Sequence, residues 1–286
     1  MLTLLAADAD ARIAERAQNA LLTIAPSALA EALAHPDVAP QLIVYCATNI
    51  GDKPGIADAV AAHPACTATQ LAHVAAHLSV TGIQAMMEDL DRLSQHTDLA
   101  AALLARAPLS AEQRHQLQEL SLGPAGEETF ADAVNDAEPD AAKRLSLLQR
   151  LSQMRVTERV HLALKGGREE RMALIRDSCK VVQRAVLQSP KLSDREVESY
   201  ASMASLNDEV LRLIAAKRSF RKNYGVIRNL VNNSKTPLDV SLGLLKSIQT
   251  LDLKMLVKNK NIPETLRTTA TKMYKQRAQT RGGGGG

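Results

Sequence analysis

Two histidines, His73 and His77, are spaced by four residues, so a helix over this segment carries both imidazoles on one side. Zinc hydrolases of the H-E-x-x-H type use this spacing and need a glutamate directly after the first histidine as the general base. This chain has Val74 at that position, which excludes that chemistry. We predict an exposed histidine pair, with a structural or adventitious metal site as the alternative.

The three cysteines, Cys46, Cys66 and Cys179, are far apart in the chain and odd in number. They form no C-x-x-C pair and no cluster, so the sequence offers no ligand set for an iron–sulfur site. Their number and spacing fit a reducing compartment without a disulfide framework. We predict three buried thiols that pack as small hydrophobic groups.

A glycine pair, Gly166-Gly167, stands before a predicted helix, with Lys165 and Arg168 beside it. Amide hydrogens at the start of a helix can bind phosphate. No predicted strand precedes the pair, which excludes a P-loop or a dinucleotide-binding fingerprint and favours a plain turn between helices. We also find no nucleophile elbow, kinase signature or hydrolase spacing, so we predict no catalytic residue, cofactor or metal.

Basic residues gather at three places in the second half of the chain. Arg176, Lys180 and Arg184 are spaced by four residues, so they form a stripe on one side of a helix. A second group lies at residues 217–222 and a third at residues 254–260, each near a later turn. If these turns line up, the groups form one basic surface; ordinary solvent-facing charges are the alternative. We name this surface the basic ridge, and its residues are Arg176, Lys180, Arg184, Lys217, Arg218, Arg221, Lys222, Lys254, Lys258 and Lys260.

The two halves of the chain carry opposite charge. Residues 1–140 contain 6 Lys and Arg against 19 Asp and Glu, a net charge of −13. Residues 141–286 contain 29 Lys and Arg against 12 Asp and Glu, a net charge of +17. This asymmetry predicts an interaction with a charged partner and carries no information about the fold.

The composition predicts an all-α protein. The apolar fraction is 45% and consists largely of alanine and leucine, whereas aromatic residues make up only 2%. Helix-forming residues dominate and strand-forming residues are sparse. The apolar residues 1–6 are followed by Asp8 and Asp10 and lack a preceding basic residue, so we expect no signal peptide or membrane span and a cytoplasmic location.

A short phrase recurs along the chain: an apolar pair, two or three polar residues, a proline or a turn, and a new apolar-periodic run. We expect its prolines in the first turn of the following helix, because proline lacks an amide hydrogen and has a fixed φ. Copies are spaced by 44 residues from Leu187 to Val231 and by 43 from Ile214 to Val257. The copies lie at residues 32–36, 60–64, 103–108, 186–190, 230–237 and 256–263.

Helix starts near these copies carry recognisable caps. In a capping box, a Ser or Thr and a Glu or Gln three residues later satisfy each other's backbone amides. The predicted caps are Thr67 with Gln70, Ser110 with Gln113, Ser193 with Glu196, and Thr236 ahead of Pro237.

A period in the forties built only from helices is the signature of a HEAT-like or armadillo-like array. Over most of residues 26–276 the chain resembles those families, and it is also similar to the bacterial leucine-rich repeat variant proteins. The resemblance lies in pattern and period. It implies an α-solenoid, a stack of helical repeats that presents a long surface to a partner.

The segment 122–141 separates two predicted arrays. It is acidic, contains Gly123, Pro124, Gly126 and Pro139, and has few apolar residues. This composition predicts a flexible linker, with a polar helix as the alternative. We therefore expect an acidic helical-repeat domain over residues 1–121, a basic one over 142–278 and a disordered glycine tail over 279–286. The expected helices include 83–94 and 236–249.

These observations favour a non-enzymatic scaffold or adaptor whose basic half binds an acidic surface of a protein partner. That surface can belong to the acidic half of the same or another copy. Nucleic-acid binding by the basic half is the main alternative, because a pI near 9.0 fits phosphate contacts. HEAT-like arrays include DNA glycosylases, a remote third option. Against it, the basic half offers few aromatic residues for base stacking: Tyr200, Phe220, Tyr224 and Tyr274.

Overall fold

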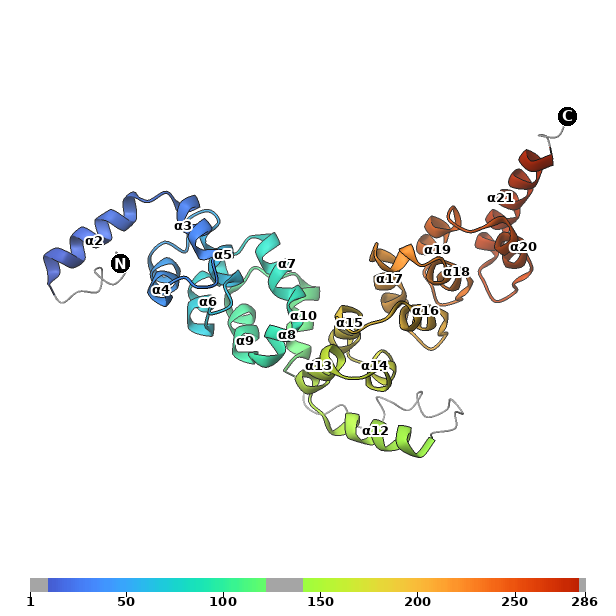
Figure 1. Ribbon diagram of the computed structural model, residues 1–286, viewed down its shortest axis with the longest axis horizontal. Helices are drawn as coiled ribbons and strands as arrows, with labels where there is room; N and C mark the ends of the chain where they lie inside the picture. Colours follow the sequence, from blue (N-terminus) through green and yellow to red (C-terminus); the bar gives the residue numbers. More distant parts are fainter. Residues whose placement is uncertain (1–9, 122–140, 283–286) are drawn as a thin grey trace. The chain divides into compact units, whose positions relative to one another are not determined.

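The computed structural model describes residues 10–121 and 141–282, and every regular element in these two ranges is a helix (Figure 1). The all-α prediction is therefore confirmed for the described residues. The chain divides into two compact units, Met1–Gly123 and Pro124–Gly286. The predicted linker falls on residues 122–140, outside the described ranges, apart from its last residue. None of the helices in those ranges is long and apolar enough to cross a membrane.

The first unit is built from short helices in two rows (Figure 1). In one row α4 packs on α6 and α6 on α9, and in the other α3 packs on α5 and α5 on α7. The rows meet where α5 contacts α4 and α6, around a core that includes the fully buried Val60, Leu71 and Val74. The helices are α2 (Ala11–Thr23), α3 (Pro26–Leu33), α4 (Pro40–Asn49), α5 (Ile56–Ala62), α6 (Ala68–Val74), the 3-10 helix η1 (Ala75–His77), α7 (Val80–Glu88), α8 (Leu90–Gln95), α9 (Thr97–Arg106) and α10 (Ala111–Glu119).

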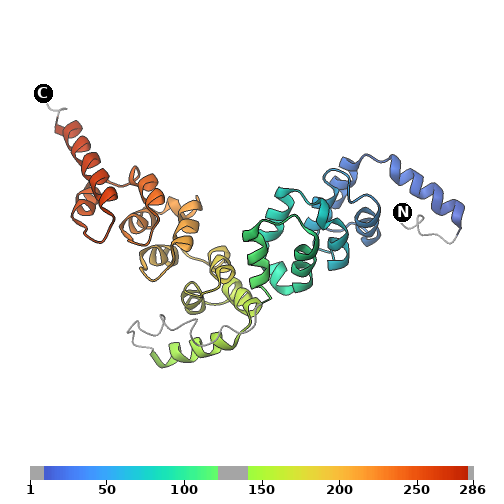
Figure 2. The same ribbon diagram turned by 180° about the vertical axis from the view of Figure 1, so that it is seen from behind.

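The second unit also arranges short helices in rows (Figures 1 and 2). α13 packs on α15 and α15 on α17, whereas α16 packs on α18, and α20 packs chiefly on the long helix α21. Its core includes the fully buried Val160, Leu174, Val182 and Leu211. The helices are α12 (Ala141–Gln153), α13 (Val156–Lys165), α14 (Arg168–Leu174), α15 (Lys180–Gln188), α16 (Asp194–Ser202), α17 (Asp208–Ala216), the 3-10 helix η3 (Phe220–Lys222), α18 (Tyr224–Asn232), α19 (Leu238–Leu245), α20 (Thr250–Lys258) and α21 (Glu264–Gly282). Residues 283–286 of the predicted glycine tail lie outside the described ranges.

The capping boxes predicted for α6, α10 and α16 are confirmed. In each, the backbone amide of the N-cap residue donates to the side chain three residues later, at 2.9, 2.9 and 3.0 Å for Thr67, Ser110 and Ser193. The prediction for Thr236 is wrong, because α19 begins at Leu238 with Pro237 as its N-cap residue and Thr236 is buried. The expectation that prolines of the recurring phrase lie in the first turn of the next helix is wrong, because they lie before it. The prolines that do begin helices, Pro26 in α3 and Pro40 in α4, are not part of the phrase.

The single helix expected over 83–94 is two helices, α7 and α8, that meet at Asp89. The Asp89 carboxylate accepts the amide hydrogen of Arg92 at 3.1 Å and so starts a new helix directly after the first one ends. The histidine pair is also divided, since His73 lies in α6 and His77 in η1, and both are exposed. The described residues contain no group of three or more His, Cys, Asp and Glu side chains that could hold a metal ion.

Five helices of the second unit, α15, α16, α17, α18 and α20, share one form. Each has nine residues and ends in a C-cap residue with extended backbone, with φ between −82° and −54° and ψ between 110° and 128°. When the C-caps are aligned, the fourth and seventh residues are buried in all five helices: Gln183 and Val186, Val197 and Tyr200, Leu211 and Ile214, Ile227 and Leu230, Leu253 and Leu256.

This alignment confirms one of the two repeat spacings predicted from the sequence and corrects the other. Leu187 and Val231 occupy equivalent positions, as the 44-residue spacing implies. Ile214, however, is equivalent to Leu256 and not to Val257, which is half-buried. The helices have one length while the turns between them differ, so the spacing is not constant.

The three thiols are buried, as predicted. Cys46, Cys66 and Cys179 are 0, 6 and 6% exposed, and none of the three forms a disulfide. Burial raises the pKa of both Cys46 and Cys66 to about 11, because the thiolate loses its hydration. At neutral pH these thiols remain protonated and pack as apolar groups.

Candidate functional site

The residues of the basic ridge come from six places in the second unit. Arg176 follows α14, Lys180 and Arg184 lie on α15, and Lys217 is the C-cap residue of α17. The remaining ones lie at η3, on α20 and after α20. The structure separates these ten residues into two sets: some contact other parts of the unit, and others face solvent.

Lys180 belongs to a series of contacts that hold the helices together. Its ammonium lies 2.6 Å from the carboxylate of Glu209, in the first turn of α17. An acidic side chain there also interacts favourably with the positive end of the helix dipole. Comparable contacts to first-turn acids are Arg150 with Glu170, Arg171 with Glu196, Arg212 with Asp239, and the Tyr224 hydroxyl with Asp252.

Among the described residues of this unit, two ion pairs are buried with known geometry. Arg171 lies 2.9 Å from Glu196, with 5 and 3% of their side chains exposed, and Arg159 lies 3.0 Å from Asp177, with 2 and 0% exposed. The Glu196 carboxylate also accepts hydrogen bonds from the backbone amide and hydroxyl of Ser193 at 3.0 and 2.7 Å. Burial acts to raise the pKa of Glu196, but the hydrogen bonds from Ser193 and Arg171 outweigh it and lower that pKa below its ordinary value.

Lys217 closes the C-terminal end of another helix. Its ammonium donates to the carbonyl oxygen of Leu187, in the last turn of α15, at 3.0 Å, and lies 4.5 Å from the centre of the Phe220 ring. Partial burial lowers the pKa of Lys217. Asn233 makes an equivalent contact, because its amide nitrogen donates to the carbonyl oxygens of Ala201 and Met203 at 3.0 and 2.9 Å.

Arg176 is a third member of the ridge that contacts the interior of the unit. It is half-buried, and its guanidinium lies 3.8 Å from the sulfur of Met203. Arg184 is half-buried on α15. Arg176, Lys180 and Lys217 therefore contribute to the packing of the second unit, which the sequence pattern alone did not indicate.

One concentration of exposed positive charge is at η3. Arg218, Arg221 and Lys222 are exposed and form no ion pair with the described residues, and we name these three residues the η3 cluster. Phe220 is only 8% exposed and fixes the short helix to the unit. No Asp or Glu occurs in the sequence between Glu209 and Asp239, so no acidic residue close in sequence offsets this charge.

A second exposed group lies on and after α20. Lys254, Lys258 and Lys260 are exposed and form no ion pair with any residue in the described ranges. Beside them, Leu251 and Met255 are 77 and 68% exposed, although both are large apolar residues. The pattern of charged residues in the sequence did not reveal this apolar pair. The sequence held a signal, because α20 carries more apolar residues than one buried face requires.

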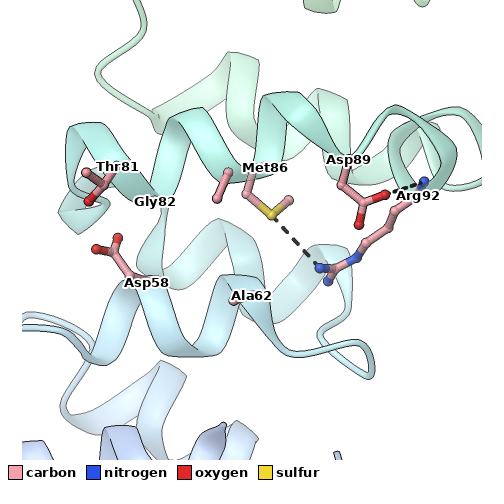
Figure 3. A pocket seen from close by; sticks show the side chains of 8 residues that line it. Asp58, Ala62, Thr81, Gly82, Met86, Asp89 and Arg92 are labelled. Atoms are coloured by element: carbon pink, nitrogen blue, oxygen red, sulfur yellow. Dashed lines mark hydrogen bonds between the residues drawn. The ribbon is translucent and has the colours of Figure 1, made fainter. Parts of the chain in front are cut away.

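A cavity of about 410 Å³ lies in the first unit between α5, α7 and the start of α8 (Figure 3). Its charged lining residues are Asp58, Asp89 and Arg92. Asp58 accepts the amide hydrogen of Ser79 at 2.9 Å, and Arg92 donates to the carbonyl oxygens of Ala61 and His63 at 2.9 and 3.0 Å. These groups are engaged in joining the helices, so the cavity is a packing feature of the unit.

The glycine pair between α13 and α14 has no free phosphate-binding geometry. The amide of Gly167 donates to the Glu170 carboxylate at 2.8 Å, and the carbonyl oxygen of Gly166 accepts from Arg171 at 2.8 Å. The carboxylate occupies the place where an anion would bind. The simpler prediction, a turn between two helices, is the one that the geometry supports.

Comparison of the chain with protein-family models, with curated proteins and with solved structures gave no significant match.

Proposed function

We propose that the chain is a helical-repeat scaffold, related in design to HEAT-like and armadillo-like solenoids, whose second unit binds an acidic surface of a protein partner. It acts by binding and not by catalysis. The observation that carries this proposal is the η3 cluster, in which three exposed cations occur within five residues of the chain and form no ion pair with the described residues. Exposed charges of one sign steer a partner of opposite charge and fix its orientation.

The repeated form of the helices supports the solenoid part of the proposal. Rows of short helices with a recurring buried pair at the fourth and seventh positions are what a stack of repeats requires, since each repeat buries its apolar face against its neighbours. Scaffolds of this kind bind through the surface that the stacked repeats expose. The η3 cluster lies at a turn between two helices of such a stack.

A protein partner is favoured over single-stranded nucleic acid by the state of the aromatic residues. Base stacking needs an exposed aromatic face. Tyr200 is fully buried, and Phe220 is 8% exposed and lies beside the Lys217 ammonium. The Tyr224 hydroxyl donates a hydrogen bond to the Asp252 carboxylate. Tyr274 is half-buried on α21. All four aromatic residues are thus buried or half-buried, and none is exposed.

The test compares three forms of the full chain as bait in a nuclease-treated native lysate. The first is the unchanged chain and the second carries Arg218→Glu, Arg221→Glu and Lys222→Glu. The third is a control with the same change in charge, Arg195→Glu, Lys246→Glu and Lys272→Glu, at exposed residues elsewhere in the unit. We expect proteins retained by the unchanged chain and the control to be lost from the η3 variant, and the difference to shrink at high salt.

Equal retention by all three forms would remove the η3 cluster as a binding surface. If retention instead depends on nucleic acid, the affinity for a DNA duplex must fall linearly with salt on logarithmic axes, with a smaller slope for the η3 variant. If the acidic partner is a second copy of the chain, sedimentation velocity must show a dimer that the η3 variant does not form.

A further inference from the structure

The apolar pair on α20 is the exposed feature that the second unit does not use for its own packing. Leu251 and Met255 are 77 and 68% exposed and are spaced by four residues, so they lie on one face of the helix. Among the described residues, no other two large and strongly exposed apolar side chains lie one helical turn apart. Single exposed apolar residues are ordinary, whereas an adjacent pair on one helix face calls for a physical reason.

One other nine-residue helix, α15, indicates what such an apolar face does. With the C-caps aligned, Leu251 and Met255 occupy the second and sixth positions of α20, which are Val181 and Ala185 in α15. These two residues of α15 are 1 and 0% exposed, and α15 packs closely on α13. α20 packs chiefly on α21, and its second and sixth positions remain exposed. Among the five aligned helices, α15 and α20 are the two with apolar residues at both positions. In α15 a neighbouring helix covers them, whereas in α16, α17 and α18 the two positions are exposed or half-buried.

The charge around the pair selects the partner. Lys254 and Lys258 are exposed on the same helix and are also spaced by four residues, and Lys260 follows in the next turn. Asp252 is the one acidic residue of α20, and its carboxylate accepts a hydrogen bond from the Tyr224 hydroxyl. The face is therefore apolar in its middle and positive beside it.

We propose that this face of α20 is a docking site for an acidic amphipathic helix of a partner protein. Apolar side chains of that helix cover Leu251 and Met255, while its carboxylates lie against Lys254 and Lys258. Helices of this kind bind through apolar residues spaced by three and four. This inference rests on the proposed function, because it names the class of acidic partner and a place where it binds.

The test uses two synthetic peptides of about 14 residues, which span four helical turns. Both contain only leucine, glutamate and alanine in the same numbers. One places its leucines along a single helix face, and the other distributes them around the helix. Fluorescence anisotropy measures their binding to the full chain. We expect the amphipathic peptide to bind at least about tenfold more tightly than the other. In the methyl spectrum of the chain, the resonance of Met255 must shift.

Three variants of the full chain locate the contact. Leu251→Ser with Met255→Ser is expected to weaken binding of the amphipathic peptide at least about tenfold. Lys254→Glu with Lys258→Glu is expected to weaken it as well, and more at low than at high salt. Val80→Ser, which changes a side chain that is 81% exposed in the first unit, is expected to have no effect. Circular dichroism checks that each variant keeps its helical content.

The inference is overturned if both peptides bind alike, or if the serine variant binds as tightly as the unchanged chain. It is also overturned if the serine variant abolishes self-association in sedimentation velocity, since the occupant would then be a second copy, or abolishes binding to vesicles that contain phosphatidylserine. If the η3 variant loses its protein partner while the serine variant keeps it, the proposed function stands and the α20 site fails. If neither variant loses it, both fail.

Discussion

At the scale of single residues, the second unit uses the same contact repeatedly: a side chain of one helix pairs with an acidic residue in the first turn of another. The contacts differ mainly in burial. The pair Arg171–Glu196 is almost completely buried, whereas Arg212 and Asp239, at 2.6 Å, keep 52 and 66% of their side chains exposed. Burial decides how much free energy of unfolding is lost when one partner is removed. Water screens an exposed pair, whereas a buried charge left without its partner is costly.

We therefore expect Arg171→Ala to lower the free energy of unfolding by about 3–5 kcal/mol, because it leaves the Glu196 carboxylate buried without its counter-ion. Arg212→Ala is the matched control and should cost much less, because water screens an exposed ion pair. Urea unfolding followed by circular dichroism measures both. Equal losses for the two variants would contradict the difference in burial.

The lowered pKa of Glu196 predicts a dependence of stability on pH. A carboxylate whose pKa is lower in the folded than in the unfolded state stabilises the fold above the unfolded pKa, about 4.3, and loses this contribution as the pH falls through the folded pKa. Glu196→Gln removes the effect. The difference in free energy of unfolding between the unchanged chain and this variant should be largest near neutral pH and shrink below pH of about 4. A constant difference down to low pH would contradict the assignment.

At the scale of helices, two of them approach each other closely because a glycine lies between them. A Cβ added to Gly82, in the first turn of α7, would lie 2.0 Å from an oxygen and 2.6 Å from the Cγ of Asp58 on α5. Asp58 cannot move away freely, since it accepts the amide hydrogen of Ser79 at 2.9 Å. Gly243, inside α19, has nothing within 4 Å of the same added atom.

We expect these two glycines to respond to alanine with opposite signs. Gly82→Ala should lower the free energy of unfolding by about 1–3 kcal/mol, because it displaces Asp58. Gly243→Ala should raise it by about 0.5–1 kcal/mol, because alanine loses less conformational entropy in a helix. Thermal unfolding of the two variants gives the signs directly. Stabilisation by Gly82→Ala would show that α5 and α7 have room to adjust.

Local chemistry made most helices predictable from the sequence. Caps such as Thr67 with Gln70 act within one turn, so the residues alone locate the start of a helix. The division of 83–94 depends on Asp89 capping α8, which a periodic apolar pattern does not reveal. The contacts of Lys180 and Lys217 could not be predicted from the sequence. Their partners, Glu209 and Leu187, are about 30 residues away and are reached only through the packing of specific helices.

At the scale of the whole molecule, each of the two units has its own buried core. Leu71, Val74 and Leu103 are fully buried in the first unit, and Val160, Leu174 and Leu211 are fully buried in the second. A unit that buries its own apolar side chains can fold by itself. The opposite charges of the two halves do not alter this expectation, since net charge affects association and not the fold.

We expect the fragments 1–123 and 124–286 each to be helical and to unfold cooperatively when they are produced separately. Far-ultraviolet circular dichroism and urea titration of each fragment measure this. The sum of the two fragment spectra should match the spectrum of the full chain. A fragment that lacks a cooperative transition would show that its core depends on the other unit.

The burial of the three cysteines allows the opening of each unit to be timed separately. Cys46 and Cys66 lie in the first unit and Cys179 in the second, and all three are buried in the folded chain, at 6% exposure or less. A thiol reagent such as Ellman's reagent attacks only an accessible thiolate. Its reaction with the native chain must therefore wait for a local or global opening. We expect mass spectrometry of reacted peptides to give one rate for Cys46 and Cys66 together and a different rate for Cys179. The native cysteines thus allow the opening rate of each unit to be measured separately, without any substitution.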